Sequence, residues 1–145
     1  PVNREQLLKW YEDRTGLTGR FRVLEAIDGA GPGLIRGRTI YQETEDFGHL
    51  HDTRYQYSPF LFEALMQLAA FHTLTVDLQN GREMVPVEIG AMRFLRRCRP
   101  GEQITIEARL RAQDQESVAW DARGLDDQGR TVMQARTLRL HWVSL

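Results

Sequence analysis

The chain has 145 residues, with 19 lysine and arginine against 20 aspartate and glutamate residues and a single cysteine. A net charge of −1 offers no overall field for nucleic acid or an anionic membrane, and one cysteine excludes an internal disulfide framework. No apolar run reaches the roughly 18 residues of a membrane-spanning helix. We therefore expect one cytoplasmic domain over residues 1–145.

The first part of the chain predicts a helix followed by two strands and a long loop. Leu7, Leu8 and Tyr11 fall on one helical face, so residues 1–17 predict an N-terminal helix with a linker. A cluster of glycines separates the two strands, and the loop is polar and aromatic without a period. The expected elements are a helix at 4–14, strands at 21–27 and 34–41, a turn at 28–33 and a loop at 42–57.

A long apolar helix follows the loop. Ser58 and Pro59 suit the N-cap and first helical positions, and Asn80-Gly81 suits the end of the helix. From residue 60 to residue 71 only Glu63 and Gln67 are polar. They lie four residues apart, so they share one stripe of the helix. A helix that is apolar all round is a buried helix.

The remainder of the chain changes to a period of two, which predicts an antiparallel meander. A single buried helix among six strands indicates an α+β fold in which an antiparallel sheet wraps around that helix. The expected strands are 85–95, 103–111, 117–125 and 130–143.

His49 and Glu63 stand fourteen residues apart and are the candidate catalytic pair. Histidine titrates near neutrality, and a carboxylate in an apolar helix is costly to bury unless it has a partner or a role. His51 is an alternative to His49, because the motif can slide by two residues. Glu63 can also be read as a helix N-terminal acid that only complements the dipole, and Gln67 as structural.

Two blocks resemble the 3-hydroxyacyl-thioester dehydratases of fatty-acid and polyketide synthesis. Gly48-His49, Glu63 and Ala64-x-x-Gln67 match that family's Gly-His loop, its acid and its Ala-x-x-Gln tail. Residues 93–104 resemble its Arg-Phe-x-Arg-Pro-Val-x-Pro-Gly-Asp-x-Leu block. Ser58 takes the position of a family glycine, and Pro59, which has no N–H, follows it where backbone amides hold the thioester carbonyl.

The resemblance implies a hotdog fold and a double-hotdog homodimer in which the histidine of one subunit meets the acid of the other. It implies loss of water from a 3-hydroxyacyl thioester, with His49 as base and Glu63 as acid, supported by Gln67 and Ser58. The acyl chain arrives on phosphopantetheine, from acyl carrier protein or coenzyme A, and no metal or redox cofactor is needed. Candidate channel residues are Tyr55, Tyr57, Phe60, Phe62 and Met66; candidate carrier or phosphate contacts are Arg96, Arg97 and Arg99, which otherwise form a solvated strand end.

Three other functions are compatible with the fold. A hotdog thioesterase uses a helix acid to activate water and does not need the histidine at this spacing. A catalytically degenerate domain that binds acyl chains or holds a synthase together is favoured by Pro59. The hydratase branch of the fold fits worst, because its aspartate–histidine spacing is not matched. The dehydratase can be free-standing or a domain of a larger synthase, and the chain's start at Pro1 without methionine favours the synthase domain.

Overall fold

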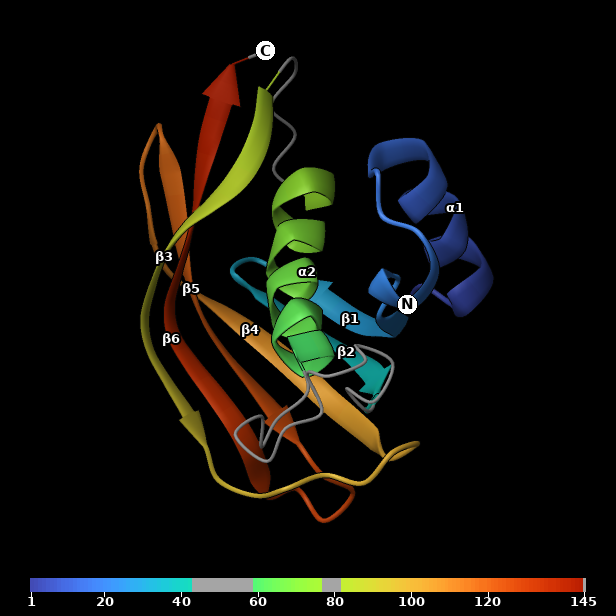
Figure 1. The fold of residues 1–145 in the computed structure, drawn as a ribbon. Coiled ribbons are helices and arrows are strands. Elements are labelled where there is room, and N and C mark those ends of the chain that lie inside the picture. The colour runs from blue at the N-terminus through green and yellow to red at the C-terminus, as the bar shows by residue number, and fades with distance from the viewer. Residues whose placement is uncertain (43–58, 77–81, 145) are drawn as a thin grey trace, which may run out of the picture.

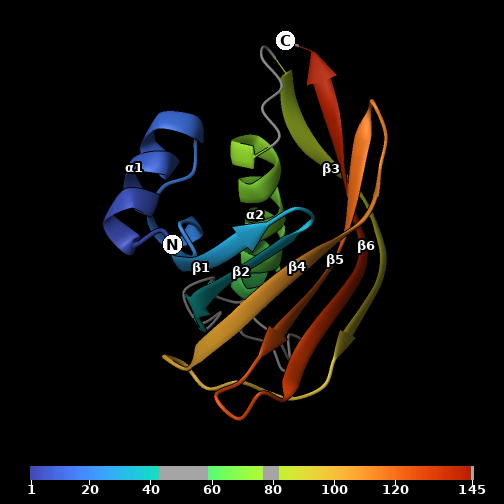
Figure 2. The ribbon, with the colours of Figure 1, turned by 180° about the vertical axis from the view of Figure 1, so that it is seen from behind.

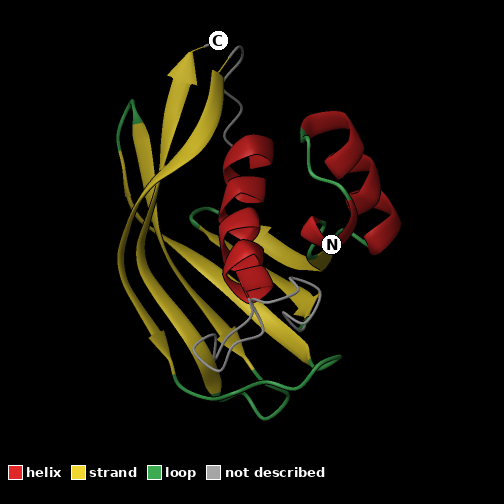
Figure 3. Ribbon diagram, in the orientation of Figure 1, coloured by secondary structure: helices red, strands yellow, loops and turns green. Residues whose placement is uncertain are grey.

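The computed structural model describes residues 1–42, 59–76 and 82–144 (Figure 1). A strongly curved antiparallel sheet partly encloses one long helix, and a shorter helix packs beside it (Figures 1 and 3). This confirms the predicted α+β architecture. The elements are α1 (Arg4–Arg14), η1 (Gly19–Phe21), β1 (Leu24–Gly31), β2 (Leu34–Ile40), α2 (Pro59–Val76), β3 (Arg82–Phe94), β4 (Gln103–Gln113), β5 (Ser117–Leu125) and β6 (Thr131–Ser144).

Helix α1 is fixed at its start by a capping box. The Asn3 side chain accepts from the Gln6 backbone N–H at 2.9 Å, and the Gln6 side chain accepts from the Asn3 N–H at 3.0 Å. Leu7 and Tyr11 are buried as predicted, whereas Leu8 is 36% exposed. The helix therefore buries only one narrow face and depends on that face for its place in the fold.

The sheet has the strand order β1-β2-β4-β5-β6-β3, which can be followed in Figure 2. All neighbouring pairs are antiparallel. On β4, Ile104, Ile106 and Ala108 are fully buried against the helix side, while exposed Arg109 belongs to the opposite face. The sheet thus separates an apolar inner face from a charged outer face.

The first strand differs from its prediction. Residues 19–21 form a short 3-10 turn, and β1 begins at Leu24 and continues through the glycine-rich segment to Gly31. Only Pro32 and Gly33 make the turn, with Gly33 at φ 66°. The β1–β2 pairing has two register irregularities, and the second lies between Ile27 and Gly29, so a glycine here marks a bulge as well as the turn.

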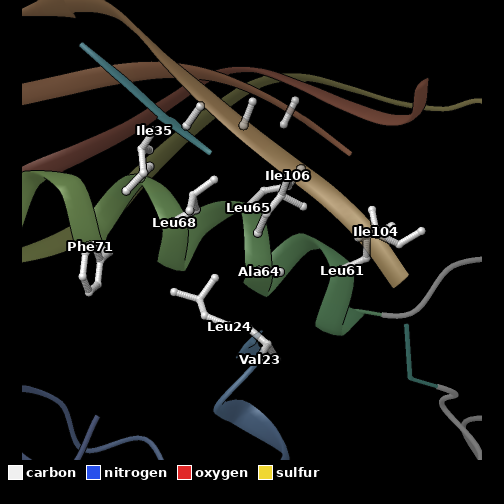
Figure 4. Packing of buried hydrophobic residues seen from close by; sticks show 14 of the residues in the cluster. Val23, Leu24, Ile35, Leu61, Ala64, Leu65, Leu68, Phe71, Ile104 and Ile106 are labelled. Atoms are coloured by element: carbon white, nitrogen blue, oxygen red, sulfur yellow. The ribbon is translucent and has the colours of Figure 1, made fainter. Parts of the chain in front are cut away.

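Helix α2 packs against strands β2 and β4 on one side and against the start of β1 on the other (Figure 4). Leu65 and Leu68 point toward the sheet residues Ile106 and Ile35, and Leu24 approaches from the other side (Figure 4). Each of these side chains is fully buried. The predicted central helix is confirmed, and its burial on two sides restricts where a polar residue on it can face.

Candidate functional site

Glu63 and Gln67 project from the first half of α2, one turn apart. Gln67 is 6% exposed, and Glu63 is partly buried. The Gln67 side-chain amide donates to the Glu63 carboxylate oxygen Oε2 at 3.0 Å. The predicted shared stripe therefore brings the two side chains into direct contact.

Gln67 also links the acid to the N-terminal part of the chain. Its Nε2 donates to the Phe21 carbonyl at 2.8 Å, and its Oε1 accepts from the Tyr11 hydroxyl at 2.5 Å. The Tyr11 oxygen in turn accepts from the Leu24 N–H at 2.9 Å. Burial raises the pKa of the Tyr11 hydroxyl above its ordinary value, so it keeps its proton and remains a donor at neutral pH.

A half-buried stripe runs along α2 beside the acid. Phe62, Glu63, Met66 and Ala70 are partly exposed, whereas most other described side chains of the helix are buried. Three of these four are apolar, and they recur at helical spacing. The stripe is therefore a surface on which an apolar group can lie against α2 next to Glu63.

Phe60 belongs to a different environment. It is 3% exposed, its ring lies 5.6 Å from that of Phe21, and the Arg20 guanidinium sits 4.8 Å from its centroid. Of the channel residues expected from the sequence, Phe62 and Met66 are thus on the open stripe and Phe60 is in the core.

The other half of the expected site lies outside the described residues. His49, its alternative His51 and Ser58 all fall in the interval 43–58, as do the channel candidates Tyr55 and Tyr57. Helix α2 begins at Pro59, as expected. Its first turn has no intrahelical partners for the backbone N–H groups.

The arginine cluster after β3 divides into two kinds of side chain. Arg96 forms ion pairs with Glu102 and with Asp126, the latter at 3.2 Å. The hydrogen bond to Glu102 raises the pKa of Arg96, and the same bond lowers that of Glu102. Arg97 and Arg99 are exposed. Arg96 therefore holds the turn together, and the other two guanidiniums face solvent.

The described residues offer neither a cluster of metal ligands nor a membrane-spanning helix. Within residues 1–42, 59–76 and 82–144, no three histidine, cysteine or acidic side chains come together as metal ligands. Neither described helix has the length and apolar character needed to cross a bilayer.

Sequence reasoning missed the role of Tyr11 and the state of Glu107. Tyr11 was expected only as an apolar face residue, although a buried tyrosine hydroxyl needs a hydrogen-bond partner. Glu107 lies on the outer sheet face but is 2% exposed, because Arg36 and Arg123 from neighbouring strands close over it. Its alternation pattern indicated a solvated residue, and the strand register that pairs it with arginines was not readable from the sequence.

Residues 3–144 match the family described as polyketide synthase dehydratase N-terminal domain. Among curated proteins, none shows significant sequence similarity to the chain. A mutant thioesterase from Pseudomonas aeruginosa superposes with a TM-score of 0.69 at 16% identity, covering 99% of this chain and 95% of that one. A Haemophilus influenzae thioesterase gives 0.67 at 16% identity over 100% and 93%.

A Streptococcus mutans protein bound to acetyl CoA gives a TM-score of 0.62 at 12% identity, covering 82% of this chain and 88% of that chain. At such low identity these structures establish the fold, which is the hotdog fold expected from the sequence. The family match covers nearly the whole chain. The chain therefore belongs to the polyketide synthase dehydratase N-terminal domain family.

Proposed function

We propose that this domain removes water from a 3-hydroxyacyl thioester to give a trans-2-enoyl thioester. The observation that carries the proposal is Glu63, a partly buried carboxylate on a mostly buried helix whose described hydrogen bond comes from a neutral amide. Such a group keeps an oxygen available for proton transfer to a substrate. Membership of a dehydratase family supports this reaction over others that the same fold performs.

The reaction needs a base at C2 and an acid at C3. His49 removes the C2 proton, and the electron pair of that C–H bond forms the C2–C3 double bond. Glu63 gives a proton to the C3 hydroxyl, which leaves as water when the C3–O bond breaks. The pair is reset when the proton on His49 returns to Glu63 through solvent.

Negative charge develops on the thioester carbonyl oxygen as the C2 proton leaves. The N-terminal end of α2 favours that charge through its dipole and its free amides. Pro59 contributes no N–H. The Ser58 N–H and the neighbouring amides of the first turn are therefore the proposed donors.

The substrate enters as an acyl chain on phosphopantetheine, carried by acyl carrier protein or coenzyme A. The apolar stripe beside Glu63, with Phe62 and Met66, is the proposed wall of the acyl channel. Tyr55 and Tyr57 are the other proposed channel residues, whereas Phe60 packs in the core and is left out of the proposed wall. The exposed Arg97 and Arg99 are proposed contacts for an acidic carrier or a phosphate.

The proposed assembly is a homodimer formed along β3. This strand of thirteen residues is at the edge of the sheet, and its Val85, Val87 and Ile89 side chains are 40%, 50% and 46% exposed. A long exposed edge strand has unpaired backbone N–H and C=O groups, which favour pairing with another chain. Pairing with the same strand of a second copy closes it by twofold symmetry. Val87→Lys with Ile89→Lys should give a monomer by light scattering; a wild-type monomer would contradict the homodimer.

A thioesterase is the second candidate, because the solved structures named above include two thioesterases and a protein bound to acetyl CoA. In that reaction Glu63 activates water for attack on the thioester carbonyl, and the thiol leaves. His49 has no required part in it. His49→Ala therefore separates the two functions.

The test is product analysis with a 3-hydroxyacyl chain on pantetheine or carrier protein. Ultraviolet absorbance and mass spectrometry should show an enoyl thioester with the wild type and none with His49→Ala or Glu63→Ala. Free acid that survives His49→Ala would establish the thioesterase. Binding of the acyl chain by a folded dimer without turnover would establish a degenerate domain, with Pro59→Gly as the variant that tests the cause.

A further inference from the structure

The hydrogen bonds around Gln67 admit only one arrangement of hydrogen atoms. The Leu24 N–H can only donate, so the Tyr11 oxygen accepts from it at 2.9 Å. A tyrosine hydroxyl has one proton to donate, and Gln67 lies 2.5 Å away to receive it. The atom of Gln67 that faces Tyr11 is therefore the amide oxygen.

This orientation also fixes the hydrogen-bond partners of the Gln67 amide nitrogen. Nε2 carries two N–H groups. One donates to the Phe21 carbonyl at 2.8 Å and the other to Glu63 Oε2 at 3.0 Å. Both acceptors require an N–H, so the reverse orientation of the amide would break three interactions at once.

Glu63 Oε2 consequently accepts from an amide whose orientation is fixed by Tyr11 of α1, and Tyr11 in turn is bonded to Leu24 of β1. Within the described residues Oε1 has no hydrogen-bond partner. A proton on this carboxyl group therefore resides on Oε1.

We propose that Tyr11 is a positioning residue for Glu63: by fixing the Gln67 amide it makes Oε1 the oxygen that exchanges a proton with the substrate. This inference rests on the proposed catalytic role of Glu63. It gives helix α1 a function beyond packing, since α1 supplies the group that orients the acid.

The attachment of α1 is strong enough for this role. Arg4 Nη1 donates to the carbonyls of Arg22 and Leu24, at 2.8 and 2.5 Å. Val2 exchanges two backbone hydrogen bonds of 2.8 Å with Ile27. Both attachments hold the start of α1 against residues 22–27, which include Leu24, whose N–H the Tyr11 oxygen accepts.

The test is a double-mutant cycle of Tyr11→Phe and Gln67→Ala. Tyr11→Phe should lower kcat about 10-fold with KM unchanged, because the acid loses its orientation and the substrate surface stays intact. In the Gln67→Ala background the same change should have no further effect on kcat. Effects that multiply, or an unchanged kcat in Tyr11→Phe, would overturn the proposal.

Thr39→Val is the matched control. It removes another buried hydroxyl hydrogen bond, from Thr39 Oγ1 to the Val23 carbonyl at 2.7 Å, without touching Gln67. It should lower thermal stability and leave kcat unchanged. An equal loss of kcat in this control would mean that Tyr11→Phe acts through stability alone, which also overturns the proposal.

Nitrogen-15 NMR of the Gln67 side chain gives a readout that does not depend on turnover. Its amide protons should be protected from exchange in the wild type, shift in Glu63→Gln and lose protection in Tyr11→Phe. If the wild type forms no enoyl product, the proposed function fails while this measurement still decides the Tyr11 linkage. Protection that survives Tyr11→Phe would refute the linkage whatever the reaction.

Discussion

Glu63 and Glu107 are both shielded carboxylates, but their surroundings differ. Glu107 is 2% exposed and receives a hydrogen bond from Arg123 at 2.5 Å and two from Arg36, one of them 3.0 Å. Glu63 is less buried and, in the described part of the chain, receives one hydrogen bond from the neutral Gln67 amide.

The difference supports the proposed division between a structural acid, Glu107, and a reactive acid, Glu63. Burial raises the pKa of Glu107, but the hydrogen bonds from Arg36 and Arg123 outweigh it and hold that pKa below its ordinary value. Both oxygens of Glu107 are occupied by guanidinium groups. Glu63 has one oxygen fixed and lies beside an apolar stripe, which suits proton exchange with a bound substrate.

Replacing the proposed reactive acid, Glu63, should give the largest effect on activity. We expect Glu63→Gln to reduce kcat for enoyl formation by about 100- to 1000-fold, because the proton donor to the C3 hydroxyl is lost. The free energy of unfolding, measured with urea, should change little since the amide can still accept from Gln67. Full activity in Glu63→Gln would remove the basis for calling this acid catalytic.

Replacing the structural acid should have the opposite pattern. Glu107→Gln is expected to lower the free energy of unfolding by about 1–3 kcal/mol, since a buried partner of two arginines is lost. The cost stays moderate because the Arg36 and Arg123 side chains are 56% and 46% exposed and can turn to solvent. At temperatures where the variant is folded, its kcat should equal that of the wild type.

The stabilisation that Glu107 provides should depend on pH. Glu107 has a lowered pKa in the folded state, so its stabilisation is present above the ordinary glutamate pKa of about 4.3 and is lost as pH falls through the folded value. The stability difference between wild type and Glu107→Gln should therefore shrink on acidification. Urea titrations from neutral to acidic pH measure it, and a constant difference would argue against the ion cluster.

The smallest expected effect comes from the cap of α1. Asn3→Ala should cost about 0.5–1 kcal/mol of stability through loss of the capping box. It should also lower kcat slightly, by less than Tyr11→Phe, because α1 carries the group that orients Gln67. Asp114→Ala is the control. It removes two 2.8 Å hydrogen bonds, from the Glu116 and Ser117 N–H groups to Asp114 Oδ1, in the turn between β4 and β5. It should lower stability without affecting kcat.

Local patterns predicted most of this fold. The helix at Arg4–Arg14, the apolar run beginning at Pro59 and the alternation in Gln103–Gln113 each follow from short-range periodicity. The extension of β1 to Gly31 was missed because bulges in a strand and turns both favour glycine. What decides between them is pairing with β2, which is a long-range property.

In the candidate site, too, contacts between residues close in sequence were predictable and long-range contacts were not. The contact between Glu63 and Gln67 followed from their spacing of four on one helix. The contact between Gln67 and Tyr11 joins residues 56 apart in the sequence, and no local pattern specifies it. Glu107 with its two arginines likewise depends on strand register, which the alternation of polar residues leaves open.

The most direct test of the proposed reaction is isotopic. An enoyl thioester on pantetheine is incubated with the wild-type protein in water enriched in oxygen-18, so that the reaction runs toward hydration. We predict oxygen-18 at C3 of an intact thioester, with incorporation about 100- to 1000-fold slower in Glu63→Gln. Oxygen-18 in the carboxylate of a released free acid, with none at C3, would contradict the dehydratase and establish thioester hydrolysis.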